Sequence, residues 1–420
     1  MIAVVAALSL SLAALAIWTL WWQLHAWRTP ETHDATGFHG PPPRPQLSFS
    51  LLVPARHEEE VLAATLRRLA AVDHPFVEVV AIVGHDDPET AKVAQAVADE
   101  LPGRVRVVVD HSWPKNKPRA MNTALPTCTA DIVGVFDAED EVDPRLLRRV
   151  DAAFDATAVD VVQGGVQLMN FDSSWFSLRN CLEYFYWFRS RLHLHAAHGF
   201  IPLGGNTVFI RREVLDRWGG WDGDCLAEDC DLGVRLSSHG HRVEVCYDPH
   251  LVTREETPPT VASLVKQRTR WNQGFLQVLR KGEWRQLPTR QRWLARATLA
   301  SPFLQAFTGV AVPASIALAL EVKVPVGLAL LSFLPAIPTV ASVAFDLAAL
   351  REFGRVYYVR PRWWHYVVLV VGTLPYNILL AAAAVRAVLR EVRGERGWEK
   401  TAHVGAHRTA APAVREEAAA

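Results

Sequence analysis

The sequence predicts an α/β domain with a mostly parallel β-sheet, flanked by transmembrane helices. Between about residues 47 and 280, short apolar runs rich in β-branched residues alternate with amphipathic helical patterns. Apolar stretches long enough to cross a bilayer lie on both sides of this region. The 44 Lys and Arg residues balance the 44 Asp and Glu residues, and 50% of the chain is hydrophobic. This composition disfavours intrinsic disorder and nucleic-acid binding.

Residues 1–24 are predicted to form a transmembrane anchor. The run 2–22 carries no charged residue, and at 1.5 Å per residue it can cross a hydrocarbon core of about 30 Å. Trp18, Trp21 and Trp22 lie where interfacial anchors are expected. A cleaved signal peptide is the alternative, but no basic residue precedes the run. Arginines follow from Arg28 onwards, so the positive-inside rule predicts a multi-pass plasma-membrane protein whose α/β domain is cytoplasmic.

A Pro-rich linker at 25–46 is expected to join the anchor to the α/β domain at 47–280. Four strands are expected there, at 47–53, 77–83, 105–109 and 132–136. Helical patterns lie at 59–71, 89–101 and 144–156, and a longer amphipathic helix is expected at 260–279. Because strands alternate with helices, the ligand site should lie beyond the carboxyl ends of the strands.

After an interfacial segment at 281–296, three further transmembrane helices are expected within residues 297–387. The runs 297–320, 324–347 and 364–385 carry almost no charge, which is uncommon in soluble buried helices of that length. These three spans would place the polar tail, 388–420, outside, whereas its basic residues favour the inside. Either the segment with Pro335 and Pro338 is re-entrant, or the last segment does not fully cross.

Acidic residues come directly after the strand expected at 132–136. Asp137 and Glu139 are one residue apart, so in an extended segment their carboxylates lie on the same side. Two such oxygen ligands suit a divalent cation that also binds a diphosphate. A solvated acidic turn before the next helix explains the pattern equally well.

A second acidic cluster, Glu228 and Asp229, precedes a helical pattern at 232–238. Carboxylates at a helix amino terminus are stabilised by the helix dipole, which is one sufficient explanation. The functional interpretation makes Asp229 a general base close to the metal pair.

The third candidate lies on the amphipathic helix at 260–279. Gln267, Arg270 and Trp271 are spaced i, i+3 and i+4 and therefore project from one helical face. An aromatic ring beside a cation and an amide is a suitable floor for a sugar or a diphosphate. The alternative is a membrane-surface helix whose Trp and Arg face the headgroups.

Further short segments complete an ordered set of motifs. They contain Ala55 with Glu58, then Lys117, then Gly205 with Asn206. Together with the three candidates above, the set resembles the membrane-embedded family-two glycosyltransferases, which include cellulose, chitin, hyaluronan and poly-N-acetylglucosamine synthases. The similarity covers about residues 48–280, with a weaker match at 398–401. Each motif is short, but their order, spacing and flanking spans make the set specific.

The resemblance implies a GT-A domain, a Rossmann-like α/β fold that binds a nucleotide-sugar, usually a UDP-sugar. Ala55, Glu58 and Lys117 match positions that contact the nucleotide. Where the family usually has Asp-Asp-Gly-Ser, this chain has Asp86 and Asp87 after a Gly-His pair, so which of the two contacts the nucleotide is open.

The resemblance also implies roles for the acidic pairs. Asp137 and Glu139 match the pair that holds Mg²⁺ or Mn²⁺ on the diphosphate, so Asp137 also belongs to the donor site. Glu139 replaces the usual Asp, which keeps the charge but lengthens the side chain. Asp229 matches the base that deprotonates the acceptor hydroxyl, with Glu228 beside it in the catalytic pair. The residues expected to contact the diphosphate and the acceptor are Gly205, Asn206, Gln267, Arg270 and Trp271.

These assignments predict a metal-dependent, inverting hexosyltransferase. The expected reaction moves a sugar to a growing polysaccharide or oligosaccharide with a β-linkage. Single transfer to a lipid acceptor is the alternative, and a transporter or scaffold without catalysis is a more distant one. The expected partners are the nucleotide-sugar donor, a glycan or lipid acceptor, the lipid bilayer and accessory export proteins, with no nucleic acid.

Overall fold

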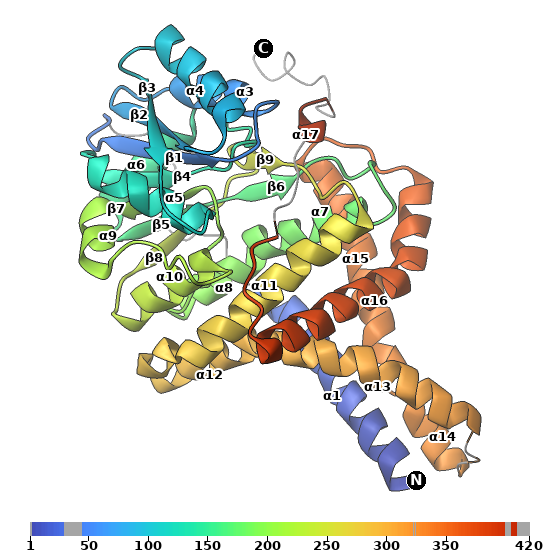
Figure 1. Cartoon of the computed structure of the whole chain (residues 1–420). Coiled ribbons are helices and arrows are strands. Elements are labelled where there is room, and N and C mark those ends of the chain that lie inside the picture. The colour runs from blue at the N-terminus through green and yellow to red at the C-terminus, as the bar shows by residue number, and fades with distance from the viewer. Residues whose placement is uncertain (1, 29–43, 322, 324, 400–404, 410–420) are drawn as a thin grey trace.

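A seven-stranded sheet forms the centre of the α/β domain in the computed structural model, which describes residues 2–28, 44–321, 323, 325–399 and 405–409 (Figure 1). The predicted α/β class with a mostly parallel sheet is confirmed. Most of the predicted linker at 25–46 lies outside the described residues, as do Lys400 and Thr401 and much of the tail.

The strand order is β3-β2-β1-β4-β7-β5-β8. β7 runs antiparallel to both β4 and β5, and the other neighbours are parallel. The strands are β1 (Phe49–Ala55), β2 (Val77–Gly84), β3 (Val105–Asp110), β4 (Ile132–Val135), β5 (Val161–Gly164), β7 (Val208–Arg211) and β8 (Val243–Cys246). A separate parallel pair consists of β6 (Val166–Leu168) and β9 (Thr253–Glu255). Because β1 to β4 are mutually parallel, their carboxyl ends share one edge of the sheet.

Alternate side chains of the strands pack against two helical layers. Leu51 and Val53 contact the first layer, whereas Leu52 between them contacts the second. The first layer contains α3 (Leu62–Ala70), α4 (Pro88–Glu100) and α6 (Leu146–Ala156). The second contains α5 (Lys117–Ala124), α7 (Ser177–Tyr186), a π-helical turn (Trp187–Arg191), α8 (Leu192–Ala197), α9 (Arg212–Trp218) and α10 (Glu228–Ser238).

The second layer continues into the apolar helices at the carboxyl end of the chain. Leu350 and Phe353 of α15 (Ala336–Val356) are fully buried in the same cluster as the second-layer helices. Leu369 of α16 belongs to this cluster too, so α15 and α16 share a hydrophobic cluster with the α/β domain.

Four helical segments are long and apolar enough to cross a membrane, which indicates membrane association. They are α1 (Ile2–Trp27), α13 (Ser301–Glu321), α14 (Val326–Ser332) together with α15, and α16 (Trp363–Arg393). α11 (Val261–Lys281), a 3₁₀ turn (Glu283–Gln286) and α12 (Thr289–Leu299) precede them. The span predicted at 324–347 is interrupted after Ser332, because Pro335 lacks an amide hydrogen and disfavours helical geometry in the residue before it.

α16 lies beside α11 (Figure 1), also packs on α13, and contacts the α/β domain near both of its ends. Near its start, His365 Nε2 lies 2.7 Å from Asp172 Oδ1. Near its end, Arg390 Nε donates a hydrogen bond to Gln273 Oε1 at 3.1 Å. A helix that crossed a bilayer would leave the domain after a few turns, since each residue adds 1.5 Å along the axis.

The outer face of α16 is an apolar stripe. Its exposed members, mostly three or four residues apart, are Val367, Val370, Val371, Leu374, Ile378, Leu389 and Val392. One apolar face and one face bound to protein are typical of a helix lying in the plane of the membrane surface. This geometry favours the second topology considered above, in which the last segment does not fully cross and the tail stays on the side of the α/β domain.

Cysteine labelling in intact cells tests this topology. All five native cysteines are buried, so single introduced cysteines carry the signal. We expect a membrane-impermeant maleimide to label Glu321→Cys, at the end of α13, from outside. Glu100→Cys on α4 and Arg393→Cys at the end of α16 should react only after permeabilisation. Labelling of Arg393→Cys from outside, with Glu100→Cys protected, would show that α16 crosses the membrane.

Candidate active site

A cavity of about 1260 Å³ lies at the carboxyl ends of β1, β3 and β4 and extends to the apolar helices. Nearly all the predicted site residues line it. These are Ala55, Glu58, Lys117, Asp137, Glu139, Gly205, Asn206, Glu228, Asp229, Gln267, Arg270 and Trp271. The side chains that the motifs single out therefore line one cavity, although they come from segments far apart in the sequence.

Lys117 is the central cation of the polar end. Its ammonium group donates hydrogen bonds to a carboxylate oxygen of Asp137 and, at 2.8 Å, to the carbonyl oxygen of Gly205. Burial opposes the charge of Lys117, but Asp137 and Glu228 outweigh burial and raise the pKa of the amine. Lys117 therefore stays protonated and provides a fixed positive charge among carboxylates.

Negative charge accumulates around the segment that follows β4. Asp137, Glu139 and Asp140 come from this segment, and Glu255 comes from the end of β9. Burial, followed by the charge of Glu255, raises the pKa of Asp140 well above its ordinary value. The amide of Asn206 donates to Asp140 at 3.1 Å and also to Glu255, so a neutral side chain holds two buried carboxylates together.

Asp137 and Glu139 fit a divalent cation bound to a diphosphate. Both line the cavity, and the surrounding carboxylates create a negative potential that a cation would relieve. Among the described residues, no group of three or more His, Cys, Asp or Glu side chains forms a closed cation site. A cation held here would keep positions for phosphate oxygens and water, as Mg²⁺ commonly does.

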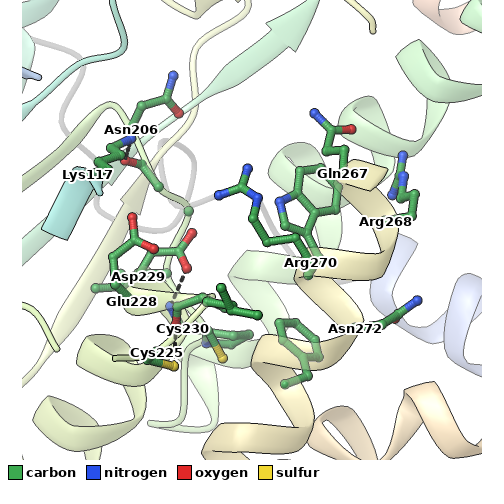
Figure 2. A pocket seen from close by; sticks show the side chains of 18 of the residues that line it. Lys117, Asn206, Cys225, Glu228, Asp229, Cys230, Gln267, Arg268, Arg270 and Asn272 are labelled. Atoms are coloured by element: carbon green, nitrogen blue, oxygen red, sulfur yellow. Dashed lines mark hydrogen bonds between the residues drawn. The ribbon is translucent and has the colours of Figure 1, made fainter. Parts of the chain in front are cut away.

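Glu228 and Asp229 begin α10 and face Arg270 across the cavity, as Figure 2 shows. Asp229 Oδ1 accepts a hydrogen bond from the amide of Cys230 at 2.7 Å. A Cβ atom at Gly205 would lie 3.1 Å from Asp229 Oδ2, so the glycine leaves space beside this carboxylate. Burial raises the pKa of both carboxyl groups, and the charge of Asp229 raises that of Glu228 further.

The cavity-facing side of α11 presents Gln267, Arg270 and Trp271. The guanidinium carbon of Arg270 lies 4.4 Å from the centre of the Trp398 ring, so the segment after α16 also reaches the site. Gln267 Oε1 and Arg270 Nε are buried without a hydrogen-bond partner among the residues that the structure describes. Buried polar atoms normally have partners, and these two are available to a ligand.

Arg268 supports this motif from the neighbouring helix face. It forms an ion pair with Glu183 of α7, and its guanidinium carbon lies 4.6 Å from the centre of the Trp271 ring. A cation over an aromatic face is attractive and directional. Arg268 therefore fixes the ring of Trp271 against the wall of the cavity.

α11 approaches the start of α10 very closely at Gly274. A Cβ atom at this position would lie 2.6 Å from the backbone nitrogen of Ala227, the residue before Glu228. Only glycine permits this approach. The contact ties the helix that carries Arg270 to the helix that carries Asp229.

Asp86 and Asp87 do not line the cavity, and a nucleotide contact from either stays a prediction. Asp87 is the N-cap of α4, where its carboxylate accepts from the amides of Thr90 at 3.3 Å and His57 at 2.6 Å. Asp86 pairs with Arg56 at 2.8 Å. Arg56 and His57, the partners of Asp86 and Asp87, both line the cavity.

Two further residues of the cavity were not predicted from the sequence. Asp110, the last residue of β3, and Lys115 both line the cavity, with Lys115 Nζ 3.1 Å from Asp110 Oδ2. Asp110 directly follows the strand expected at 105–109. The strand-end rule that selected Asp137 could therefore have selected it as well.

The apolar end of the cavity was not predicted at all. Its lining includes Leu15, Trp18 and Trp22 of α1, Leu304 of α13 and Leu380 of α16. These residues come from three segments of the chain that meet only in the folded protein. No local pattern could have revealed that the helices contribute to the site.

Comparisons with known proteins agree with the site geometry. Residues 45–274, more than half of the chain, match the family model described as glycosyltransferase-like family 2. The β-monoglucosyldiacylglycerol synthase of Synechocystis sp. is 28% identical over 293 residues, which is 63% of this chain and 60% of that protein. The same enzyme of Trichormus variabilis is 30% identical over 233 residues, 54% of this chain and 49% of that protein.

More distant relatives include a polymer-forming enzyme. The poly-β-1,6-N-acetyl-D-glucosamine synthase of Staphylococcus epidermidis is 24% identical over 252 residues, 58% of each protein. The chain thus spans about half to three-fifths of the length of these relatives. Among solved structures, a mannosyltransferase from Pyrobaculum calidifontis in complex with GDP-Man and Mn²⁺ has a TM-score of 0.62 at 18% identity, covering 93% of this chain and 99% of that one. That likeness supports the GT-A fold.

The close approach at Gly274 predicts a specific sensitivity of the fold. Gly274→Ala should lower the unfolding temperature of the detergent-solubilised protein, because overpacking typically costs about 1–3 kcal/mol. Gly327→Ala on α14 is the matched control, since a Cβ there meets nothing within 4 Å. Equal unfolding temperatures for both variants and the native chain would show that α10 and α11 are not packed as described.

Proposed function

The chain belongs to the glycosyltransferase-like family 2, and on this premise we propose that it transfers a single sugar from a nucleotide-sugar to a membrane lipid. The transfer inverts the anomeric centre and yields a β-linkage. A UDP-sugar is the expected donor. We thus prefer a lipid acceptor, the alternative in the sequence-based prediction, to a growing polysaccharide or oligosaccharide.

The observation that carries the proposal is the two-ended cavity. Its polar end holds Lys117 and Asp229, and its apolar end is lined by Trp18 of α1 and Leu304 of α13. A lipid has the same division, with a hydroxyl at one end and acyl chains at the other. The acyl chains would lie among helices that themselves contact the bilayer.

A polymer acceptor has less support. An exported polymer needs a channel through the membrane, and α16 lies flat on the α/β domain. Among the described helices, α1, α13 and the α14–α15 pair then remain as spans. The two relatives with the higher identities are named for the glycosylation of diacylglycerol.

The groups at the polar end divide the chemistry between them. Asp229 accepts the proton of the acceptor hydroxyl as the oxygen forms its bond to the anomeric carbon. The bond from that carbon to the diphosphate breaks, and the nucleoside diphosphate leaves with the electron pair. Lys117 and Arg270 lie where their positive charges oppose the negative charge that develops on the leaving group.

Asp137 and Glu139 would hold Mg²⁺ or Mn²⁺ at the diphosphate. When bound, such a cation acts as a Lewis acid and stabilises the departing charge. Lys117, which contacts Asp137 and the carbonyl oxygen of Gly205, would lie beside the bound cation.

The test uses the purified full-length chain in nanodiscs with Mn²⁺ and a panel of UDP- and GDP-sugars. We expect release of the nucleoside diphosphate to depend on diacylglycerol in the nanodisc, and the product to carry one added hexose by mass spectrometry. Asp229→Asn should lower the rate by about 10²- to 10⁴-fold. A ladder of products would support polymer synthesis instead. No turnover with any donor would favour a scaffold without catalysis.

The coupling of Glu228 and Asp229 predicts that kcat/KM falls at an unusually high pH as the solution is made more acidic. This fall is the acid limb of the pH profile. Burial and the charge of Asp229 raise the pKa of Glu228 to about 7, and burial raises the pKa of Asp229. Because the two groups titrate as a coupled pair, Asp229 carries part of the first proton, and activity falls as the pH drops below neutral. Glu228→Gln removes one charge, which favours the ionised base and should move the limb to lower pH by about one unit. Glu244→Gln, at a buried glutamate on β8 away from the cavity, should not move it. An unmoved limb in Glu228→Gln would contradict the coupling.

Blocking the apolar end should separate lipid glycosylation from donor hydrolysis. Thr308 of α13 lines this end of the cavity. Thr308→Trp is expected to lower lipid glycosylation by about tenfold, since misfit costs about 1–3 kcal/mol, with slow hydrolysis of the donor by water unchanged. Thr339→Trp on α15, which does not line the cavity, is the control. Equal lipid glycosylation in both variants would exclude this route for the acyl chains.

A further inference from the structure

The chain returns to the α/β domain after α16. The short helix α17 (Ala406–Thr409) lies against α3 and the segment 137–140, which contains the proposed cation ligands. We call residues 137–140 the metal loop. Three hydrogen bonds from one guanidinium, that of Arg408, make most of this contact.

Two of the three acceptors of Arg408 belong to α3 and its N-cap, and the third belongs to the metal loop. Nη1 donates to the carbonyl of Val61 at 3.1 Å, at the start of α3. Nη2 donates to Thr65 Oγ1 at 2.6 Å and to the carbonyl of Glu139 at 3.0 Å. Arg408 therefore binds α3 and the metal loop to one another.

Thr65 extends the same network. Its hydroxyl accepts from Arg408 and donates to the carbonyl of Ala138 at 2.7 Å. Inside the loop, the amide of Asp137 donates to Asp140 Oδ2 at 2.8 Å. The backbone carbonyls of Ala138 and Glu139 are thus both held from outside the loop, the first by Thr65 and the second by Arg408.

A second, separate contact holds α17 in place. The amide of Ala406 donates to a carboxylate oxygen of Glu256, which follows the β9 residue Glu255 that shares Asn206 with the metal loop. The neighbouring side chain of His407 is 1% exposed. The segment is therefore packed between the two stretches of chain that frame the cation ligands.

The surroundings of Arg408 act on its charge in both directions. Burial and the nearby Arg68 lower the pKa of Arg408, whereas Glu141, Glu139 and Asp140 attract its charge. A guanidinium remains protonated in proteins and offers five donors in a planar fork. The guanidinium of Arg408 donates to three oxygens, and its positive charge opposes the negative charge of the loop.

We propose that Arg408 is a positioning residue for the cation site. It fixes the peptide of Glu139, and through it the spacing between the carboxylates of Asp137 and Glu139. Groups that orient ligands from outside the coordination sphere typically alter metal affinity by about 10- to 100-fold. The inference rests on the proposed function, because that function supplies the divalent cation.

The experiment measures Mn²⁺ binding in the presence of UDP, by the electron paramagnetic resonance signal of free Mn²⁺, on the full-length chain in detergent. Arg408→Ala should weaken Mn²⁺ binding by about tenfold. Thr65→Val, which removes the bridging hydroxyl, should weaken it by a smaller factor. Arg67→Ala is the matched control. Arg67 is an arginine of α3 that pairs with Glu100 on the surface.

A purely structural role for Arg408 predicts a different result. In that case Arg408→Ala lowers the unfolding temperature but leaves the Mn²⁺ affinity of the folded protein unchanged, and the proposal is overturned. An equal loss of affinity in Arg67→Ala overturns it too. If Arg408→Ala does not fold, Thr65→Val decides, with native Mn²⁺ affinity as the contrary result. A native chain that binds no Mn²⁺ with UDP would instead refute the metal-dependent function itself.

Discussion

The site depends on a balance between buried negative charge and the few groups that oppose it. Asp137 and Asp140 lie in one corner of the sheet edge, where unpaired carboxylates would be costly. Lys117 supplies the permanent cation, Asn206 supplies a neutral donor, and Arg408 acts from the far end of the chain. Each opposing group comes from a different element, so the folded chain as a whole maintains a charge distribution that a cation and a diphosphate complete.

The helices next to the membrane are part of this arrangement. Arg268 joins α11 to α7 through Glu183, and Gly274 lets α11 touch Ala227, the residue before Glu228. α16 also packs on α11. The helices next to the membrane therefore help to hold Arg270 opposite Asp229.

Local rules were sufficient for some of the site and not for the rest. Asp137 and Glu139 could be selected because they follow a strand at the ligand edge, but Asp87 follows a strand too and is a helix cap. A position after a strand therefore does not by itself distinguish a cavity-lining carboxylate from a helix cap. α16 shows the same limit, since length and composition are alike for a helix that spans the bilayer and one that lies on it. The apolar end of the cavity depends on helices meeting in space, which no single segment encodes.

The flat stripe of α16 has a consequence for kinetics. With the stripe at the headgroups, the cavity keeps a constant depth in the membrane, so the lipid acceptor proposed above would reach it by lateral diffusion in two dimensions. The effective acceptor concentration is then a mole fraction in the leaflet, independent of the volume of the surrounding solution. Diluting the acceptor with other lipids slows such an enzyme even when the total amount of acceptor stays the same.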